Sequence, residues 1–305
     1  MKTQNPSEIR SCSKNVCACA PNKTIQWRIN CDCDEICTFC IGADELHEVK
    51  PDESMAVFDK LIDGGASEII ITGGEPLLST RLDRMLRHLH ERSVKVVLYT
   101  NCKFWDFHDE TIRTCVDTVC VPIEGASEFV HDGVRGKNNL RKILSILDRY
   151  ARDASNRLFT VRVGTAVGRH NLNELEAIAY MLSHYQIESW TLHKHVRYTD
   201  RVVRNYFKKH RANISLAEFE TTCRKLINES EFDLPIQLST EIQRDSNFLM
   251  LNQDLALAVP VRDENGRLVD RVLADVETYD VEELVETWRT SVQMERYEDA
   301  FKISL

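Results

Sequence analysis

Three cysteines, Cys33, Cys37 and Cys40, stand in a C-x3-C-x2-C arrangement near the N-terminus. Three thiolates on one short loop can bind three corners of a 4Fe-4S cube and leave the fourth iron without a protein ligand. Chemistry can take place at that open iron. The spacing alone leaves two other interpretations: Cys37 and Cys40 form a redox C-x-x-C pair, or Cys31 completes a four-ligand zinc site.

The cysteine distribution supports a metal or redox role for this region. The chain has 11 cysteines, and seven of them fall between Cys12 and Cys40. Disulfides rarely persist in a reduced compartment, so such crowding indicates ligation or redox chemistry. The later cysteines fit the role of small buried residues better: Cys102, Cys115, Cys120 and Cys223.

The elements that must position this loop alternate along the chain. Alternating or apolar runs predict strands over residues 24–30, 68–72, 94–99, 118–123, 158–167 and 189–196. Apolar residues at helical spacing predict helices over residues 52–62, 81–91, 106–114, 139–151 and 172–183. This order favours parallel βαβ units with right-handed crossovers, and therefore an α/β fold built as a parallel barrel or an open parallel sheet.

The pattern changes after residue 196. A polar stretch is followed by a predicted helix over residues 215–228 and by a hairpin whose turn is Asp263-Glu264-Asn265-Gly266. We therefore expect three parts: an N-terminal cysteine-containing segment (1–23), a barrel (24–196) and a C-terminal α+β extension packed on it (197–305).

A second motif follows the second predicted strand. In Gly73-Gly74-Glu75-Pro76 the paired glycines let a ligand approach the backbone, and a carboxylate can receive an ammonium group; the structural alternative is a tight turn. This motif and the three cysteines, on successive strand ends, together resemble the radical S-adenosylmethionine superfamily. The resemblance covers about residues 24 to 200. We expect the single-cluster type, although Cys12, Cys17, Cys19 and Cys31 are further thiols.

The resemblance implies a fold and an activity. The fold is a partial (β/α)6 parallel barrel, with the motifs at the C-terminal ends of its strands. S-adenosylmethionine (AdoMet) binds the open iron through its amino and carboxylate groups, and reductive cleavage gives a 5'-deoxyadenosyl radical that removes a substrate hydrogen. An electron donor such as flavodoxin or ferredoxin is implied as a partner.

The resemblance also implies roles for individual residues. Phe39 lies near the adenine, and Glu75 with its neighbouring backbone binds the methionine amino group. The implied cofactor-binding set is Phe39, Gly73, Gly74, Glu75, Pro76, Asn101, Glu124, Arg169 and Asn171. Asn101 and Glu124 are ribose-side contacts, whereas Arg169 and Asn171 border the cofactor or belong to a solvated turn. Cys102 and Glu124 depart from the Gly and Asp that are usual there.

A basic segment begins at the predicted end of the sixth strand. Residues 193–211 contain seven Lys or Arg and one acidic residue, in a chain whose net charge is -9. Such a segment can attract an anionic substrate such as a phosphate, with Lys194, Arg197, Arg201 and Arg204 as its contacts, or it can be a solvated basic helix. Residues 188–195 and 214–219 also resemble viperin-like enzymes that act on nucleoside triphosphates.

Other functions stay open. The substrate can be a small metabolite or a peptide that is modified, and Cys223 could return a hydrogen atom as a catalytic thiol, whereas Cys115 and Cys120 are less attractively placed. Buried structural cysteine is the alternative for Cys223. A non-catalytic regulatory module that uses its cysteines only to bind metal or a cluster is the non-enzyme alternative.

Composition excludes several classes of protein. Hydrophobic residues make up 43% of the chain, which excludes a disordered tail or a collagen-like fibre. No apolar run approaches the roughly 18 residues that span a bilayer, and the first residues lack a secretory signal. We therefore expect a cytoplasmic protein with no membrane and no nucleic-acid polymer among its partners.

Overall fold

The computed structural model describes residues 24–35, 37, 40, 51–153, 158–194, 214–239, 248–262 and 268–275. In this part of the chain the strands form one ten-stranded sheet. In chain order they are β1 (Thr24–Arg28), β2 (Glu68–Thr72), β3 (Lys95–Tyr99), β4 (Thr118–Pro122), β5 (Thr160–Val167), β6 (Ser189–Lys194), β7 (Ile236–Ser239), β8 (Phe248–Leu251), β9 (Ala256–Arg262) and β10 (Leu268–Asp275).

The sheet is parallel except at one edge. Its order is β10-β9-β8-β1-β2-β3-β4-β5-β6-β7, and all pairs from β8 to β7 are parallel. β9 and β10 add an antiparallel hairpin beside β8. The carboxyl ends of β1 to β6 therefore lie along one rim, which is where functional groups gather in parallel barrels.

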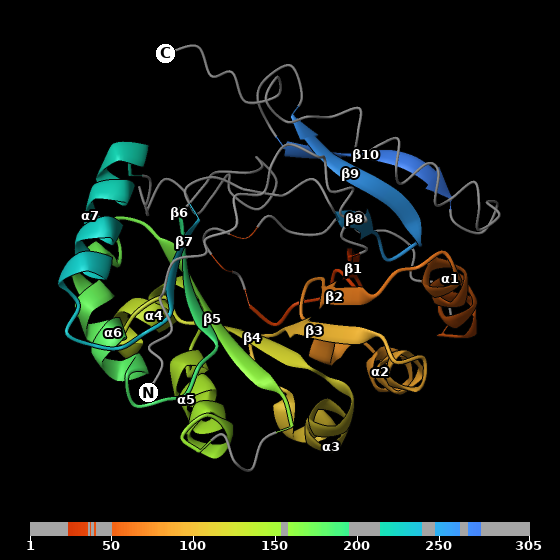
Figure 1. Ribbon diagram of the computed structural model, residues 1–305, viewed down its shortest axis with the longest axis horizontal. Helices are drawn as coiled ribbons and strands as arrows, with labels where there is room; N and C mark the ends of the chain where they lie inside the picture. Colours follow the sequence, from red (N-terminus) through yellow and green to blue (C-terminus); the bar gives the residue numbers. More distant parts are fainter. Residues whose placement is uncertain are drawn as a thin grey trace, which may run out of the picture.

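Helices cover the outer side of this sheet. They are α1 (Pro51–Asp63), α2 (Leu82–Glu91), α3 (Trp105–Cys115), α4 (Glu128–Val134), α5 (Asn139–Tyr150), α6 (Leu175–Leu182) and α7 (Leu216–Glu229), with short 3-10 turns η1 (Pro76–Leu78) and η3 (Leu172–Glu174). Figure 1 shows the sheet curved into an arc, with α1, α2, α3, α5, α6 and α7 on the convex side. The fold is thus α/β, with the curved parallel sheet of a partial barrel, as predicted.

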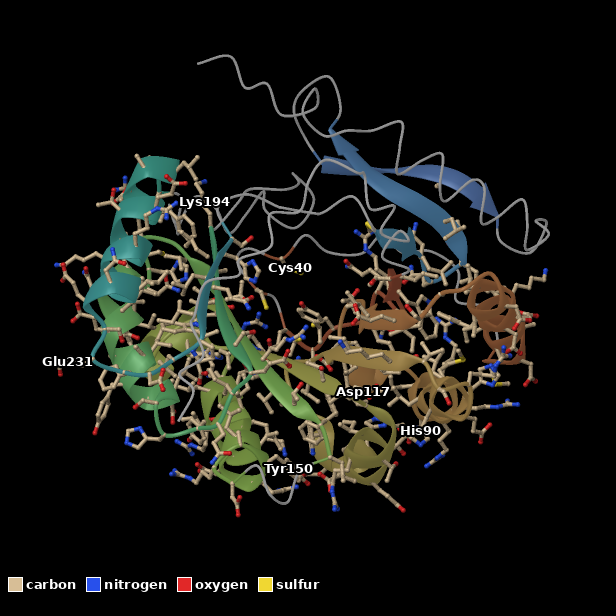
Figure 2. The ribbon with its side chains drawn as sticks, in the orientation of Figure 1. Cys40, His90, Asp117, Tyr150, Lys194 and Glu231 are labelled. Carbon is tan, nitrogen blue, oxygen red and sulfur yellow. The ribbon has the colours of Figure 1, made fainter. Side chains whose placement is uncertain are left out.

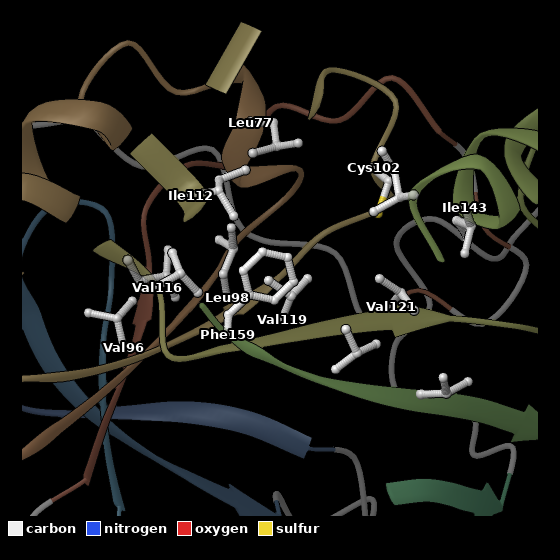
Figure 3. Close-up of a cluster of buried hydrophobic side chains, with 14 of the residues drawn as sticks. Leu77, Val96, Leu98, Cys102, Ile112, Val116, Val119, Val121, Ile143 and Phe159 are labelled. Atoms are coloured by element: carbon white, nitrogen blue, oxygen red, sulfur yellow. The ribbon is translucent and has the colours of Figure 1, made fainter. Parts of the chain in front are cut away.

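The hydrophobic core lies between the sheet and these helices. Along β5, residues 161, 163, 165 and 167 are buried and the residues between them are half-buried, which is the two-residue period of a strand. Figure 3 shows this layer around Leu98, Val119 and Phe159, with Ile112 of α3 packed against it. The half-buried residues that alternate with these core residues lie on the opposite, concave face of the sheet.

The six predicted strands of the barrel are present, each within three residues of its expected ends where the structure describes them, and the predicted C-terminal hairpin forms. The strands β7 and β8 and the helix α4 were missed, because β7 and β8 have four residues each and α4 has seven, too few to show a period. β7 extends the sheet beyond β6, and β8 pairs with β1. The division at residue 196 remains a prediction, although strands from both sides of it share one sheet.

None of the helices in the described ranges is long and apolar enough to cross a membrane.

A chain of buried hydrogen bonds joins three strands on the helix side of the sheet. The indole N–H of Trp190 donates to Thr165 Oγ1 at 2.9 Å, and that hydroxyl donates to the Ile123 carbonyl at 2.5 Å. We expect Thr165→Val to lower the free energy of unfolding by about 1–3 kcal/mol, because it leaves two buried polar groups without partners. Denaturant unfolding measures this. Thr191→Val, at a half-buried position of β6, is the control, and an equal loss in both variants would contradict the assignment.

Candidate functional site

The cysteine loop begins directly after β1 and lies against the end of β2. The Gly74 N–H donates to the Asn30 carbonyl at 2.9 Å, and the Glu75 N–H donates to the Asp32 carbonyl at 2.7 Å. A Cβ atom on Gly74 would lie 2.1 Å from the Asp32 carbonyl oxygen, and one on Gly73, whose φ is +147°, would lie 2.6 Å from Asn30 Oδ1. The close approach that requires these glycines is therefore made by the chain's own loop, whereas the sequence had suggested a ligand.

The three cysteines of the motif differ in exposure. Cys33 and Cys40 are exposed and Cys37 is buried, and the Cys40 N–H donates to the Cys37 carbonyl at 3.2 Å. Although Cys33 is exposed as a residue, partial desolvation of its sulfur raises the pKa of this thiol to about 11, and burial raises the pKa of the Cys37 thiol further. Ligation must therefore displace thiol protons at neutral pH.

The arrangement of these thiols bears on which metal group fits. Among the residues that the structure describes, no three Cys, His, Asp or Glu side chains converge closely enough to hold one metal ion. A zinc site needs such convergence, with all ligands about 2.3 Å from one ion. In an iron–sulfur cube each thiolate binds a different iron, so the sulfurs need not meet at one point. Three thiols on one loop therefore fit a cluster better than a single zinc ion.

Two carboxylates of the loop are tied to later strand ends. Asp34 accepts from Asn101 Nδ2 at 2.8 Å and pairs with Lys103 Nζ at 3.0 Å. Glu35 pairs with Lys103 Nζ at 3.1 Å and with Arg135 Nη1 at 3.6 Å. The Glu35 and Arg135 side chains are 1% and 15% exposed, so these pairs are poorly screened by solvent and fix the loop to the rim.

Glu75 joins the ends of β2 and β3. Its Oε1 accepts from Leu77 N at 3.1 Å and from Thr100 Oγ1 at 2.6 Å, and its Oε2 accepts from Asn101 N at 2.7 Å. Burial raises the pKa of this carboxyl to about 7, and the three hydrogen bonds oppose that rise. Pro76 follows at the start of η1, which the Glu75 side chain caps.

Glu124 and Asn171 continue the same connections to β5. Glu124 accepts from Arg135 Nε at 3.1 Å and from Ala166 N at 2.7 Å. Asn171 Nδ2 donates to the carbonyls of Glu124 at 2.9 Å and Ala166 at 3.1 Å, and its Oδ1 accepts from Gly168 N at 2.9 Å. The Asn171 amide is therefore engaged in joining β4 to β5.

These groups form one polar system along the rim, in which Asp34 is exposed, Lys103 and Arg135 are half-buried and the others are buried. We call it the strand-end network: Asn30, Asp34, Glu35, Glu75, Asn101, Lys103, Glu124, Arg135 and Asn171. The sequence indicated Glu75, Asn101, Glu124 and Asn171. It gave no role to Asp34, Glu35 or Lys103, because an ion pair between residues about 70 positions apart leaves no local pattern.

Cys102 stands where the resemblance led us to expect a glycine. Its φ is +67°, in the left-handed region, and its N–H donates to Thr100 Oγ1 at 2.9 Å. The departure at this position therefore keeps the backbone conformation of a glycine, with a buried thiol packed in the hydrophobic core (Figure 3).

The remaining predicted site residues are spread more widely. Arg169 is exposed after β5, and Cys223 is buried in the hydrophobic core on α7, where burial raises its pKa to about 12. Lys194, labelled in Figure 2 at the end of β6, alternates in phase with the core residues Trp190 and Leu192, whereas His193 is in phase with the concave face. Phe39, Arg197, Arg201 and Arg204 lie outside the described residues.

Comparison with known proteins places this geometry in context. Residues 27–182 match the sequence pattern of the Radical SAM superfamily. The AdoMet-dependent heme synthase of Methanosarcina barkeri is 26% identical over 159 residues, which are 50% of this chain and 45% of that protein. The GTP 3',8-cyclase of Helicobacter pylori is 36% identical over 85 residues, 25% of this chain and 26% of the relative. The matched segments thus span less than half of these relatives.

A solved structure supports the fold. Streptococcus suis SuiB bound to S-adenosylmethionine superposes with a TM-score of 0.68 at 12% identity, over 87% of this chain and 65% of SuiB. At this identity the likeness concerns the fold alone, and it agrees with a partial barrel.

The contact between the loop and β2 predicts the effect of one methyl group. Gly74→Ala should lower the free energy of unfolding by about 3 kcal/mol and make Cys37 react faster with iodoacetamide, since the Cβ must push the backbone at Asp32 away. The matched control is Gly133→Ala in α4, where a Cβ meets no atom within 4 Å and should stabilise by about 0.5–1 kcal/mol. Unchanged stability and thiol reactivity in Gly74→Ala would contradict the contact.

A buried histidine predicts a pH dependence. His131 Nδ1 accepts from Glu124 N at 3.0 Å, its Nε2 lies 2.8 Å from Asn139 Oδ1, and burial lowers its pKa from 6.5 to about 4. Because the unfolded chain binds this proton first, the free energy of unfolding should fall as pH drops from 6.5 toward 4, by up to about 1.4 kcal/mol per pH unit. His131→Gln should flatten that slope in denaturant unfolding. Exposed His90→Gln should leave it unchanged, and equal slopes in all three proteins would refute the prediction.

Proposed function

The chain belongs to the radical SAM superfamily, and from this premise we propose that Cys33, Cys37 and Cys40 hold one 4Fe-4S cluster at which AdoMet is reductively cleaved. Superfamily membership supports an enzyme and sets aside a purely regulatory metal-binding module. One observation carries the proposal: three thiols on a loop that is docked on Gly74 and Glu75 at the rim of a parallel sheet.

The strand-end network would hold AdoMet beside that cluster. A carboxylate has about four acceptor positions, and Glu75 uses three of them within the described residues, so one is left for the methionine ammonium group. Asn30 Oδ1, buried with no hydrogen-bond partner among those residues, is a further acceptor beside Gly73. The backbone of Gly73, Gly74 and Pro76 would complete this contact.

The other proposed cofactor contacts are further along the rim. Asn101 and Glu124 would face the ribose, Arg169 and Asn171 would border the cofactor, and Phe39 would lie near the adenine. In the structure Asn101 bonds Glu75 at the end of β2, and Glu124 and Asn171 join the ends of β4 and β5, so their contribution would also be to fix these strand ends under the bound molecule.

When bound, the cluster and AdoMet supply a 5'-deoxyadenosyl radical that abstracts a substrate hydrogen. The chain's own part is placement. Lys103 and Arg135 neutralise Asp34 and Glu35 and hold the loop in one position. A reducing partner protein, such as a flavodoxin or ferredoxin, would deliver the electron to the rim, where Cys33 and Cys40 are exposed.

The substrate would bind on the concave face. Its wall carries half-buried Arg28 and Arg162 together with exposed Tyr99 and His193, so it suits a polar or anionic molecule. Relatives named for heme and GTP chemistry and a SuiB structure with a precursor peptide are compatible with a small metabolite or a peptide. A basic contribution from Lys194, Arg197, Arg201 and Arg204, and a viperin-like triphosphate substrate, remain predictions.

Replacing Cys33, Cys37 and Cys40 with Ala tests the proposed function. After anaerobic reconstitution the wild type should bind about four irons and four sulfides per chain and release 5'-deoxyadenosine from AdoMet under reduction, and the triple variant should do neither. Cys31→Ala is the matched control because Cys31 lies on the same loop. Loss of metal in Cys31→Ala, with zinc bound and no sulfide in the wild type, would overturn the cluster in favour of a zinc site.

A further inference from the structure

Strand register places a tyrosine and a cysteine side by side on the concave wall. Tyr99 pairs with Cys120 across β3 and β4, and Cys120 pairs with Arg162 across β4 and β5. Their chain neighbours Leu98 and Val119 belong to the hydrophobic core on the helix side. Because side chains alternate along a strand, Tyr99, Cys120 and Arg162 face the other way, into the interior of the arc in Figure 1.

This position separates Cys120 from the three other buried thiols that follow the motif among the described residues. Cys102, Cys115 and Cys223 are all part of the core between the sheet and the helices. Cys120 is 6% exposed but is not part of that core. The sequence had favoured Cys223 as a catalytic thiol, whereas the structure puts Cys120 on the face where a substrate would bind.

Tyr99 and Cys120 are neighbours that differ in exposure to solvent. The two residues lie directly opposite each other in the register of β3 and β4, and Tyr99 is 48% exposed whereas Cys120 is 6% exposed. Burial raises the pKa of Cys120 to about 12, and the neighbouring thiol together with burial raises the pKa of Tyr99. Both groups therefore keep their hydrogens at neutral pH.

Arg162 completes the surroundings of the pair. Its Nη2 lies 2.6 Å from Glu188 Oε1, and the other oxygen of Glu188 accepts from Thr160 Oγ1 at 2.6 Å. The guanidinium is thus paired with a carboxylate, and its charge lowers the pKa values of Tyr99 and Cys120 by less than the other groups and desolvation raise them. The pair is left as a neutral O–H and S–H facing the interior.

We propose that Tyr99, which lies beside Cys120 on the concave face, donates a hydrogen atom to carbon radicals formed in the barrel interior. Phenolic O–H and thiol S–H bonds are weaker than the C–H bond of an alkyl group, so the transfer is downhill. The carbon radical becomes C–H, and the unpaired electron passes to the Tyr99–Cys120 pair. One electron from a low-potential reductant, of the class that must reduce the cluster, and one proton from water restore the pair.

This inference rests on the proposed function and specifies what becomes of the substrate radical. A substrate radical that receives a hydrogen on the concave wall leaves as a closed-shell product with no net oxidation. The enzyme would therefore carry out a redox-neutral change, such as inversion or isomerisation at carbon, on its substrate.

The test needs no substrate. The reconstituted protein cleaves AdoMet with dithionite in D2O, where tyrosine and cysteine hydrogens exchange for deuterium, and mass spectrometry measures the fraction of singly deuterated 5'-deoxyadenosine. We expect most of the wild-type product to carry one deuterium, and Tyr99→Phe and Cys120→Ala each to lower that fraction at least threefold. Tyr180→Phe, at an exposed tyrosine of α6, and Cys115→Ala, at a core thiol, should match the wild type.

The outcomes separate two failures. If no 5'-deoxyadenosine is released by the wild type, the proposed function fails. If it is released without deuterium, or if Tyr99→Phe retains the wild-type fraction, Tyr99 is not the donor, and an unchanged fraction in Cys120→Ala removes the thiol from the pair. Should Tyr99→Phe release no product because it does not fold, Tyr99→Leu, which also lacks the hydroxyl, replaces it, and a wild-type fraction of deuterated product in that variant overturns the proposal.

Discussion

The close approach of residues 30–32 to the backbone of Gly73 and Gly74 is the contact on which the site depends. It requires two positions without a Cβ, and it converts the first loop after β1 into a fixed part of the rim. Once the loop is held there, Asp34 and Glu35 reach Asn101, Lys103 and Arg135, and the strand-end network can close. A loop held only by its cysteines would lack this order before the cluster binds.

Polar groups with defined partners fix the positions of the strand ends along this rim. Each carboxylate of the network has charged or N–H partners. These ion pairs and hydrogen bonds offset the free energy that the carboxylate loses when it leaves water. Glu75 joins the ends of β2 and β3, and Glu124 and Asn171 join the ends of β4 and β5. Hydrophobic packing on the convex side leaves the concave face for polar residues. The convex face therefore contributes mainly to the stability of the fold, and the concave face carries the polar groups that a substrate would contact.

The sequence predicted the six strands of the barrel because their buried runs are long enough to show periodicity. The short β7, β8 and α4 were missed for the opposite reason. The motifs identified the rim, but they could not reveal that Gly74 accommodates Asp32, which depends on a contact between distant segments. Register likewise decides that His193 rather than Lys194 is in phase with the concave face, and that Cys120 lies there and Cys223 does not.

The central claim is that the three-cysteine loop holds a cluster with an iron open to AdoMet. Electron paramagnetic resonance of the reconstituted, reduced protein tests it most directly, with spectra recorded before and after AdoMet is added. The account predicts the signal of a reduced 4Fe-4S cluster whose g-values shift when AdoMet binds the open iron. A cluster signal that AdoMet leaves unchanged, or a reduced protein with no cluster signal, would contradict it.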